Sequence, residues 1–197
     1  IVTINFDGFM VKADIYLNDK YLGRFVSAYN PITIDVTSFI KQKDNVLIVV
    51  LDSTEDNNVP PFGYAVDYLT YGGIYRGVSL NVHPKVYIEK TLVSGSSSGN
   101  ISIKNIIGGN KEKSHEISYE LYLNEKLIDS FDDENHTIKD VLLWDVDNPV
   151  LYKLVSKLNS EYGESVYETF FGFRTIRFEK EGFYLNDKKI KMVNNES

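Results

Sequence analysis

Residues 67 to 80 read DYLTYGGIYRGVSL and place a carboxylate, three aromatic rings and a guanidinium within one short stretch. Asp67 could accept two directional hydrogen bonds from a ligand's hydroxyl groups, and bonds to a charged acceptor are stronger than bonds to a neutral one. Tyr68 and Tyr71 offer aromatic rings that could stack on flat ligand faces. The competing interpretation is that Asp67 caps a loop amide and that both tyrosines pack against the protein.

Arg76 stands out in the same stretch because of where its charge falls. If the run from Tyr71 onward is a strand, Arg76 shares one face with Ile74, Val78 and Leu80. An unpaired buried charge is too costly to keep, so we expect a buried structural residue that binds a carboxylate or a backbone carbonyl. The two glycines before it would let the chain turn tightly into the strand.

One motif suggests a nucleophile but lacks the context that it needs. Residues 95 to 99, GSSSG, match the G-x-S-x-G pattern of a hydrolase, which requires a strand before the serine and a helix after it. The strand-like NISIKNII follows instead, so we expect a loop.

The metal-ligating residue types do not cluster. The chain has no cysteine, and its histidines, His83, His115 and His136, lie far apart in sequence. The acidic stretches DSTEDNN and FDDEN are more typical of solvated loops than of catalytic pairs. We therefore expect no metal site and no cofactor.

Composition narrows the class of protein. The 197 residues are 43% hydrophobic, which can supply a real core, and the formal net charge is −7. This charge and the lack of a basic stripe oppose binding to nucleic acid. No run of 18 or more apolar residues occurs, so no membrane span or membrane partner is expected.

Alternation of apolar and polar residues dominates the chain and predicts an all-β fold. Residues 12 to 25, KADIYLNDKYLGRF, read as a hairpin that turns at Asn18-Asp19, and Gly108-Gly109-Asn110 offers a second turn of that kind. Short strands with regular turn signals favour antiparallel sandwiches. A boundary falls near His83-Pro84, and a second strand set runs to Phe173.

Short motifs in a fixed order resemble glycoside hydrolase family 2, which includes β-galactosidases, β-glucuronidases and β-mannosidases. The resemblance spans essentially the whole chain. The matching residues are Ile15-Tyr16-Leu17-Asn18 with Gly23, Tyr71 through Arg76, Asn148 through Leu154, Phe171-Gly172-Phe173-Arg174, and Leu185-Asn186 through Val193-Asn194.

The resemblance implies a domain plan. Residues 1–83 would form an N-terminally incomplete jelly-roll sugar-binding domain, and residues 84–173 an immunoglobulin-like β-sandwich. Residues 174–197 would form a hairpin and the lead-in to an absent (β/α)8 barrel. The chain is thus expected to be a fragment of a retaining β-glycosidase, with both catalytic carboxylates beyond Ser197, and to be inactive alone.

The resemblance also implies a substrate-binding residue. In β-galactosidases of this family an aspartate nine residues before the strand arginine reaches the galactosyl subsite, and Asp67 stands nine residues before Arg76. A β-galactosidase with Asp67 as a contact is therefore expected, with Tyr68 and Tyr71 as weaker candidates and a β-glucuronidase as the next choice. Gly77 departs from the acidic or amide residue that many members carry there.

The expected partners are the carbohydrate substrate, the protein's own C-terminal barrel and a second copy in a homo-oligomer. A free-standing carbohydrate-binding or cell-surface adhesion module is the alternative, because sandwich folds host many functions. A third possibility is that both domains act only as scaffold and subunit interface.

Overall fold

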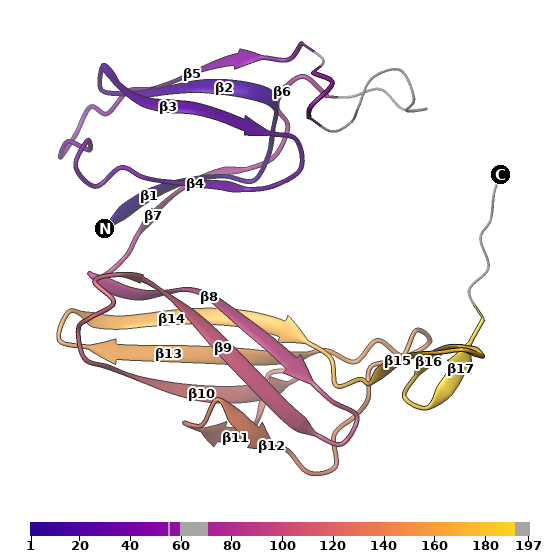
Figure 1. Cartoon of the computed structure of the whole chain (residues 1–197). Coiled ribbons are helices and arrows are strands. Elements are labelled where there is room, and N and C mark those ends of the chain that lie inside the picture. The colour runs from indigo at the N-terminus through magenta and orange to yellow at the C-terminus, as the bar shows by residue number, and fades with distance from the viewer. Residues whose placement is uncertain (55, 60–70, 192–197) are drawn as a thin grey trace. The chain divides into compact units, whose positions relative to one another are not determined.

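The computed structural model describes residues 1–54, 56–59 and 71–191 (Figure 1). The chain divides into two compact units, Ile1–His83 and Pro84–Ser197. No helix occurs in the described part of the chain, and both units are built from antiparallel sheets. The prediction of an all-β fold made of sandwiches is confirmed.

The first unit is a sandwich of two sheets. One sheet has the order β4-β1-β7, and the other has the order β3-β2-β5 with β6 added beside β2. Residues from both sheets meet in one core, in which Ile4 and Phe6 from β1 lie with Phe9 and Ile15 from β2. The strands are β1 (Val2–Phe6), β2 (Phe9–Leu17), β3 (Lys20–Ser27), β4 (Ile32–Asp35), β5 (Leu47–Asp52), β6 (Gly73–Ile74) and β7 (Val78–Val82).

The expected hairpin joins β2 to β3 and is confirmed. Asn18 and Asp19 have φ values of 50° and 65°, in the left-handed region that asparagine and aspartate tolerate best among residues with a side chain. Because both central residues of this two-residue turn have positive φ, its twist matches that of the flanking strands.

The second unit is also a sandwich. Its larger sheet has the order β11-β10-β13-β14 and its smaller sheet the order β12-β9-β8, and a third sheet, β15-β16-β17, follows at the C-terminal side. The strands are β8 (Val86–Gly95), β9 (Asn100–Gly109), β10 (His115–Leu123), β11 (Lys126–Phe131), β12 (Asn135–Thr137), β13 (Tyr152–Ser160), β14 (Gly163–Phe171), β15 (Ile176–Glu179), β16 (Gly182–Leu185) and β17 (Lys188–Ile190).

Two turn expectations differ from the structure. The Gly108-Gly109-Asn110 segment does not close a hairpin, because β9 and the next strand, β10, belong to different sheets. Residues 174–191 form two successive hairpins, β15-β16 and β16-β17, where the sequence predicted one.

The GSSSG segment is a hairpin turn between β8 and β9, so the helix that a nucleophile elbow requires is absent at this point.

Candidate functional site

An aromatic pair flanks β6, with Tyr71 before the strand and Tyr75 after it. The rings of Tyr71 and Tyr75 stack with centroids 5.7 Å apart and planes 14° apart. The Tyr75 hydroxyl donates to the Ala28 carbonyl oxygen, and its ring packs on the small cluster of Met10 and Val11. Tyr71 is 69% exposed. The contacts of Tyr75 therefore hold its ring in place, while the Tyr71 ring that stacks on it is open to solvent.

A serine fixes the start of β6. Ser53 Oγ donates to the Met10 carbonyl oxygen at 2.8 Å and accepts from the Gly73 amide nitrogen at 3.2 Å. Gly73 has φ of 86°, which L side chains rarely adopt, and this explains why glycine stands here. The segment that carries Tyr71 is therefore tied to both β2 and the residue that follows β5.

Arg76 is exposed, and the prediction of a buried arginine in a continuous strand is wrong. The strand is interrupted: β6 ends at Ile74, β7 begins at Val78, and Arg76 lies in the bend between them. The backbone-binding part of the expectation does hold, because Arg76 Nη1 donates to the Tyr29 carbonyl oxygen at 3.3 Å. The guanidinium also lies 5.3 Å from the Tyr75 ring centroid, a cation–π distance.

The remaining predicted site residues, Asp67 and Tyr68, lie outside the described residues. Their role stays a prediction. Tyr71, the third candidate, is placed by the stack on Tyr75 with its ring open to solvent.

One ion pair of the first unit strongly lowers the pKa of its carboxyl group. Lys12 Nζ lies 2.6 Å from Asp56 Oδ2. The hydrogen bond from Lys12, followed by that from the Asn58 backbone amide, lowers the pKa of Asp56 from 3.8 to about 2. The charged form of Asp56 therefore favours the folded state.

We expect Asp56→Asn to remove a pH-dependent part of the first unit's stability. Because the pKa is lowered on folding, this part is fully present above pH 3.8 and is lost as the pH falls toward about 2. The difference in melting temperature between the native chain and Asp56→Asn should therefore shrink across this window. Melting curves between pH 5 and pH 1.5 would measure it, with Asp19→Asn as the control; a constant difference would contradict the linkage.

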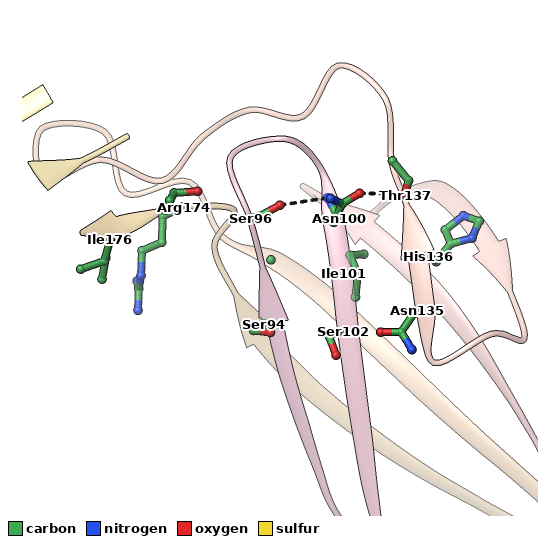
Figure 2. Close-up of a pocket in the computed structure, with 12 residues that line it drawn as sticks. Ser94, Ser96, Asn100, Ile101, Ser102, Asn135, His136, Thr137, Arg174 and Ile176 are labelled. Carbon is green, nitrogen blue, oxygen red and sulfur yellow. Dashed lines mark hydrogen bonds between the residues drawn. The ribbon is translucent and has the colours of Figure 1, made fainter. Parts of the chain in front are cut away.

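The second unit holds a pocket of about 600 Å³, and most of the residues that line it carry hydroxyl or amide groups. Figure 2 shows Ser96, Asn100 and Thr137 joined by dashed hydrogen bonds, with Arg174 on one side and His136 on the other. Its hydroxyl and amide groups come from β8, β9 and β12, from Ser96 in the turn between β8 and β9, and from Thr175 just before β15. Such groups suit a hydroxylated ligand, because each can donate and accept.

The sequence analysis did not find a histidine–carboxylate pair whose histidine lines this pocket. His136 Nε2 lies 3.0 Å from Asp129 Oδ2, and the His136 ring stacks on Phe131 with centroids 4.1 Å apart. The hydrogen bond from His136 lowers the pKa of Asp129. No hydrogen bond from His136 to a serine is present among the described residues, so no serine–histidine nucleophile forms there.

Other chemistries find little support in the described residues. No group of three His, Asp or Glu side chains there is close enough together to hold a metal ion. The acidic stretch Asp132-Asp133-Glu134 is exposed, as expected for a solvated loop. No helix in the part of the chain that the structure describes is long and apolar enough to cross a membrane.

Two family models match the chain in succession. Residues 1–84 match "Glycosyl hydrolases family 2, sugar binding domain", and residues 80–174 match "Glycosyl hydrolases family 2". The division between the models coincides with the division between the two compact units.

Curated relatives and solved structures agree with these matches. A beta-galactosidase of Thermoanaerobacterium thermosulfurigenes is 38% identical over 98% of this chain and 30% of its own length. A beta-galactosidase of Thermoanaerobacter pseudethanolicus is 30% identical over 97% of this chain and 28% of its own length. The structure of a b-glucuronidase from Ruminococcus gnavus in complex with D-glucuronic acid superposes with a TM-score of 0.82 at 18% identity, over 96% of this chain and 36% of that one.

Proposed function

Because this chain belongs to glycosyl hydrolase family 2, we propose that it forms the accessory, non-catalytic domains of a longer retaining β-glycosidase. The observation that carries the proposal is the succession of the two family matches, residues 1–84 and 80–174, over the two compact units. The chain spans about 30% of the length of the curated relatives given above. The reaction would thus be performed by the remainder of the protein.

In a retaining enzyme two carboxyl groups flank the scissile bond at about 5–5.5 Å from each other. One attacks the anomeric carbon while the other protonates the leaving oxygen and later activates water. We assign both to a (β/α)8 barrel beyond Ser197. The loops of the first unit would then form one wall of the active site, since barrel sites open at their loop-bearing face.

We propose a β-galactoside as the substrate. The two relatives at 38% and 30% identity are named beta-galactosidases, which supports this choice. Asp67 would accept hydrogen bonds from the galactosyl hydroxyls. The open ring of Tyr71, held on Tyr75, would lie beside them as a stacking surface.

Hydrolysis by the full-length protein of a panel of chromogenic β-glycosides tests this function. We expect the β-galactoside to be cleaved fastest and its product to be released with retained configuration, which proton NMR of the fresh product can follow. The 197-residue chain is the matched control and should cleave none of the panel. Activity of this chain alone, or an inactive full-length protein, would overturn the proposal.

The second candidate function is a free-standing carbohydrate-binding or adhesion module. It is favoured by the hydroxyl- and amide-lined pocket of the second unit and by the exposed Tyr71. It predicts that the 197-residue chain binds a soluble glycan by calorimetry with no enzyme attached. An active full-length glycosidase, whose isolated accessory chain binds no glycan, would exclude it.

A further inference from the structure

A row of polar side chains crosses the sheet β12-β9-β8 of the second unit. Ser102 of β9 pairs directly with Ser94 of β8 on one side and with Asn135 of β12 on the other. Directly paired residues share a face, and all three are exposed, whereas the preceding residue of β9, Ile101, is buried in the core. These three residues, which we call the polar row, therefore lie on the face turned away from the core, where they line the pocket of about 600 Å³.

The polar row leads to a cation. The Arg174 backbone amide donates to the Gly95 carbonyl oxygen at 3.0 Å, which places Arg174 beside the end of β8. Its guanidinium lies 4.7 Å from the centroid of the Trp144 ring. A guanidinium that stacks on an aromatic ring keeps its N–H groups available, because they lie in its own plane. Figure 2 shows the order across the pocket, from Arg174 through Ser94 and Ser102 to Asn135.

The polar row and Arg174 have polar groups to offer a ligand. In the part of the chain that the structure describes, no side chain of the polar row makes a hydrogen bond. The Arg174 guanidinium likewise neither donates a hydrogen bond nor pairs with a carboxylate of a described residue, and its contact is the Trp144 ring. A ligand could therefore bind all four side chains without breaking a bond inside the protein.

The neighbouring groups of the pocket hold one another in place. The Thr137 hydroxyl donates to Asn100 Oδ1 at 2.8 Å, and the Asn100 side-chain amide donates to Ser98 Oγ at 3.1 Å. Ser97 Oγ lies 2.7 Å from Thr175 Oγ1, which ties the turn between β8 and β9 to the segment before β15. The polar row thus lies beside a wall whose shape is fixed before any ligand arrives, and such preorganisation lowers the cost of binding.

The charge of the pocket favours an acidic ligand. Arg174 lines it, and no aspartate or glutamate is among its described lining residues, although the formal net charge of the chain is −7. Asp133 and Glu134 of the adjacent loop do not line it. The Nε2 atom of His136, which also lines it, is taken up by Asp129 at 3.0 Å. The free guanidinium fork matches the geometry of a carboxylate or another oxyanion.

We propose that this pocket binds an acidic saccharide, whose carboxylate or sulfate group lies on Arg174 and whose hydroxyl groups lie on the polar row. Serine hydroxyls and asparagine amides can each donate and accept, as the hydroxyl groups of a sugar do. The oxyanion would receive charge-assisted hydrogen bonds, so it would set the direction of the saccharide along the row. The site belongs wholly to the second unit, and the inference does not depend on the proposed glycosidase reaction.

Isothermal titration calorimetry of the 197-residue chain tests the site with trigalacturonic acid, a sulfated galactose trisaccharide and neutral galactotriose. We expect at least one acidic probe to bind about tenfold or more tightly than the neutral one, and the probe that binds distinguishes a carboxylate from a sulfate. The full-length protein should bind the same probe. Failure of both acidic probes, equal binding of the neutral one, or binding by this chain that the full-length protein lacks would overturn the proposal.

Two variants test the contacts. Arg174→Gln removes the charge and should weaken binding of the acidic probe about tenfold or more, because hydrogen bonds to a charged group are the strong ones. The matched control is Arg177→Gln, which removes a cation of β15 that does not line the pocket and should leave binding unchanged. Ser102→Val removes the central hydroxyl of the polar row, keeps a residue that favours strands, and should weaken binding severalfold.

Melting temperatures equal to that of the native chain would show that these variants fold. If Arg174→Gln melts earlier because it loses its stack on Trp144, the exposed Ser102 position still decides the matter. Native affinity in Ser102→Val, or an equal loss of affinity in Arg174→Gln and Arg177→Gln, would show that the acidic saccharide does not bind at this pocket.

Discussion

Replacing Phe173 by alanine is expected to lower the free energy of unfolding of the second unit by about 3–5 kcal/mol, the usual cost of removing a buried phenylalanine ring. Phe173 is fully buried, at 0% exposure. Its ring meets Tyr152 edge-on at 4.9 Å and Phe171 at 5.1 Å. Its carbonyl oxygen accepts from the Trp144 amide at 2.9 Å, so the cavity would open beside a backbone junction.

Chemical denaturation followed by tryptophan fluorescence would measure this loss, because Trp144 is the only tryptophan in the chain and lies in the second unit. The matched control is Phe178→Ala, since Phe178 is 79% exposed and touches Phe183 with ring centroids 5.1 Å apart. We expect the control to change the free energy by less than about 0.5 kcal/mol, as is usual for surface substitutions. Equal losses in both variants would show that Phe173 does not anchor this core.

The sequence predicted the structure best where a feature depends on only a few neighbouring residues. The Asn18-Asp19 turn needs two residues that tolerate positive φ, and both are visible in the sequence. Gly109 carries the same kind of signal, with φ of 76°, yet the chain continues into the other sheet. Turn chemistry encodes where the chain bends, whereas the choice of sheet depends on which core the next strand covers.

Arg76 shows a second limit of local patterns. The two-residue period predicted one strand from Tyr71 onward, but β6 pairs with β2 while β7 pairs with β1. The chain crosses from one sheet to the other in this bend. The face occupied by a residue of β6 therefore does not determine the face occupied by a residue of β7. The period holds within β7 and cannot be carried across the bend.

The His136–Asp129 pair shows that the spacing of residues in the sequence does not reveal contacts between strands of different sheets. The two residues come from β12 and β11, which lie in different sheets of the second unit. The alternation in each strand gives no sign that the sandwich brings these strands together. An aspartate and a histidine on either side of one short turn, here FDDEN, are the signal that could have suggested the contact.

We expect Asp67→Ala to lower kcat/KM of the full-length enzyme on a β-galactoside by about 10- to 100-fold. The argument rests on the proposed function and on the carboxylate's ability to accept two hydrogen bonds from the sugar. Hydrogen bonds to a charged group contribute about 1.5–3 kcal/mol, and each 1.4 kcal/mol is a factor of ten. Steady-state kinetics at substrate concentrations above and below KM would separate binding from turnover.

Two controls make the interpretation of Asp67→Ala specific. Asp133→Ala removes an exposed carboxylate from a loop of the second unit and should leave kcat/KM unchanged. Asp67→Asn keeps one acceptor and should lose less activity than alanine, because only the charge and one of the two acceptor oxygens disappear. Asp67→Ala could match the native enzyme in kcat/KM while the full-length protein still cleaves β-galactosides. In that case Asp67 makes no substrate contact, and the proposed β-galactosidase activity does not depend on it. If the melting temperature of Asp67→Ala falls together with kcat/KM, and Asp67→Asn behaves in the same way, the carboxylate stabilises the protein and does not bind the sugar.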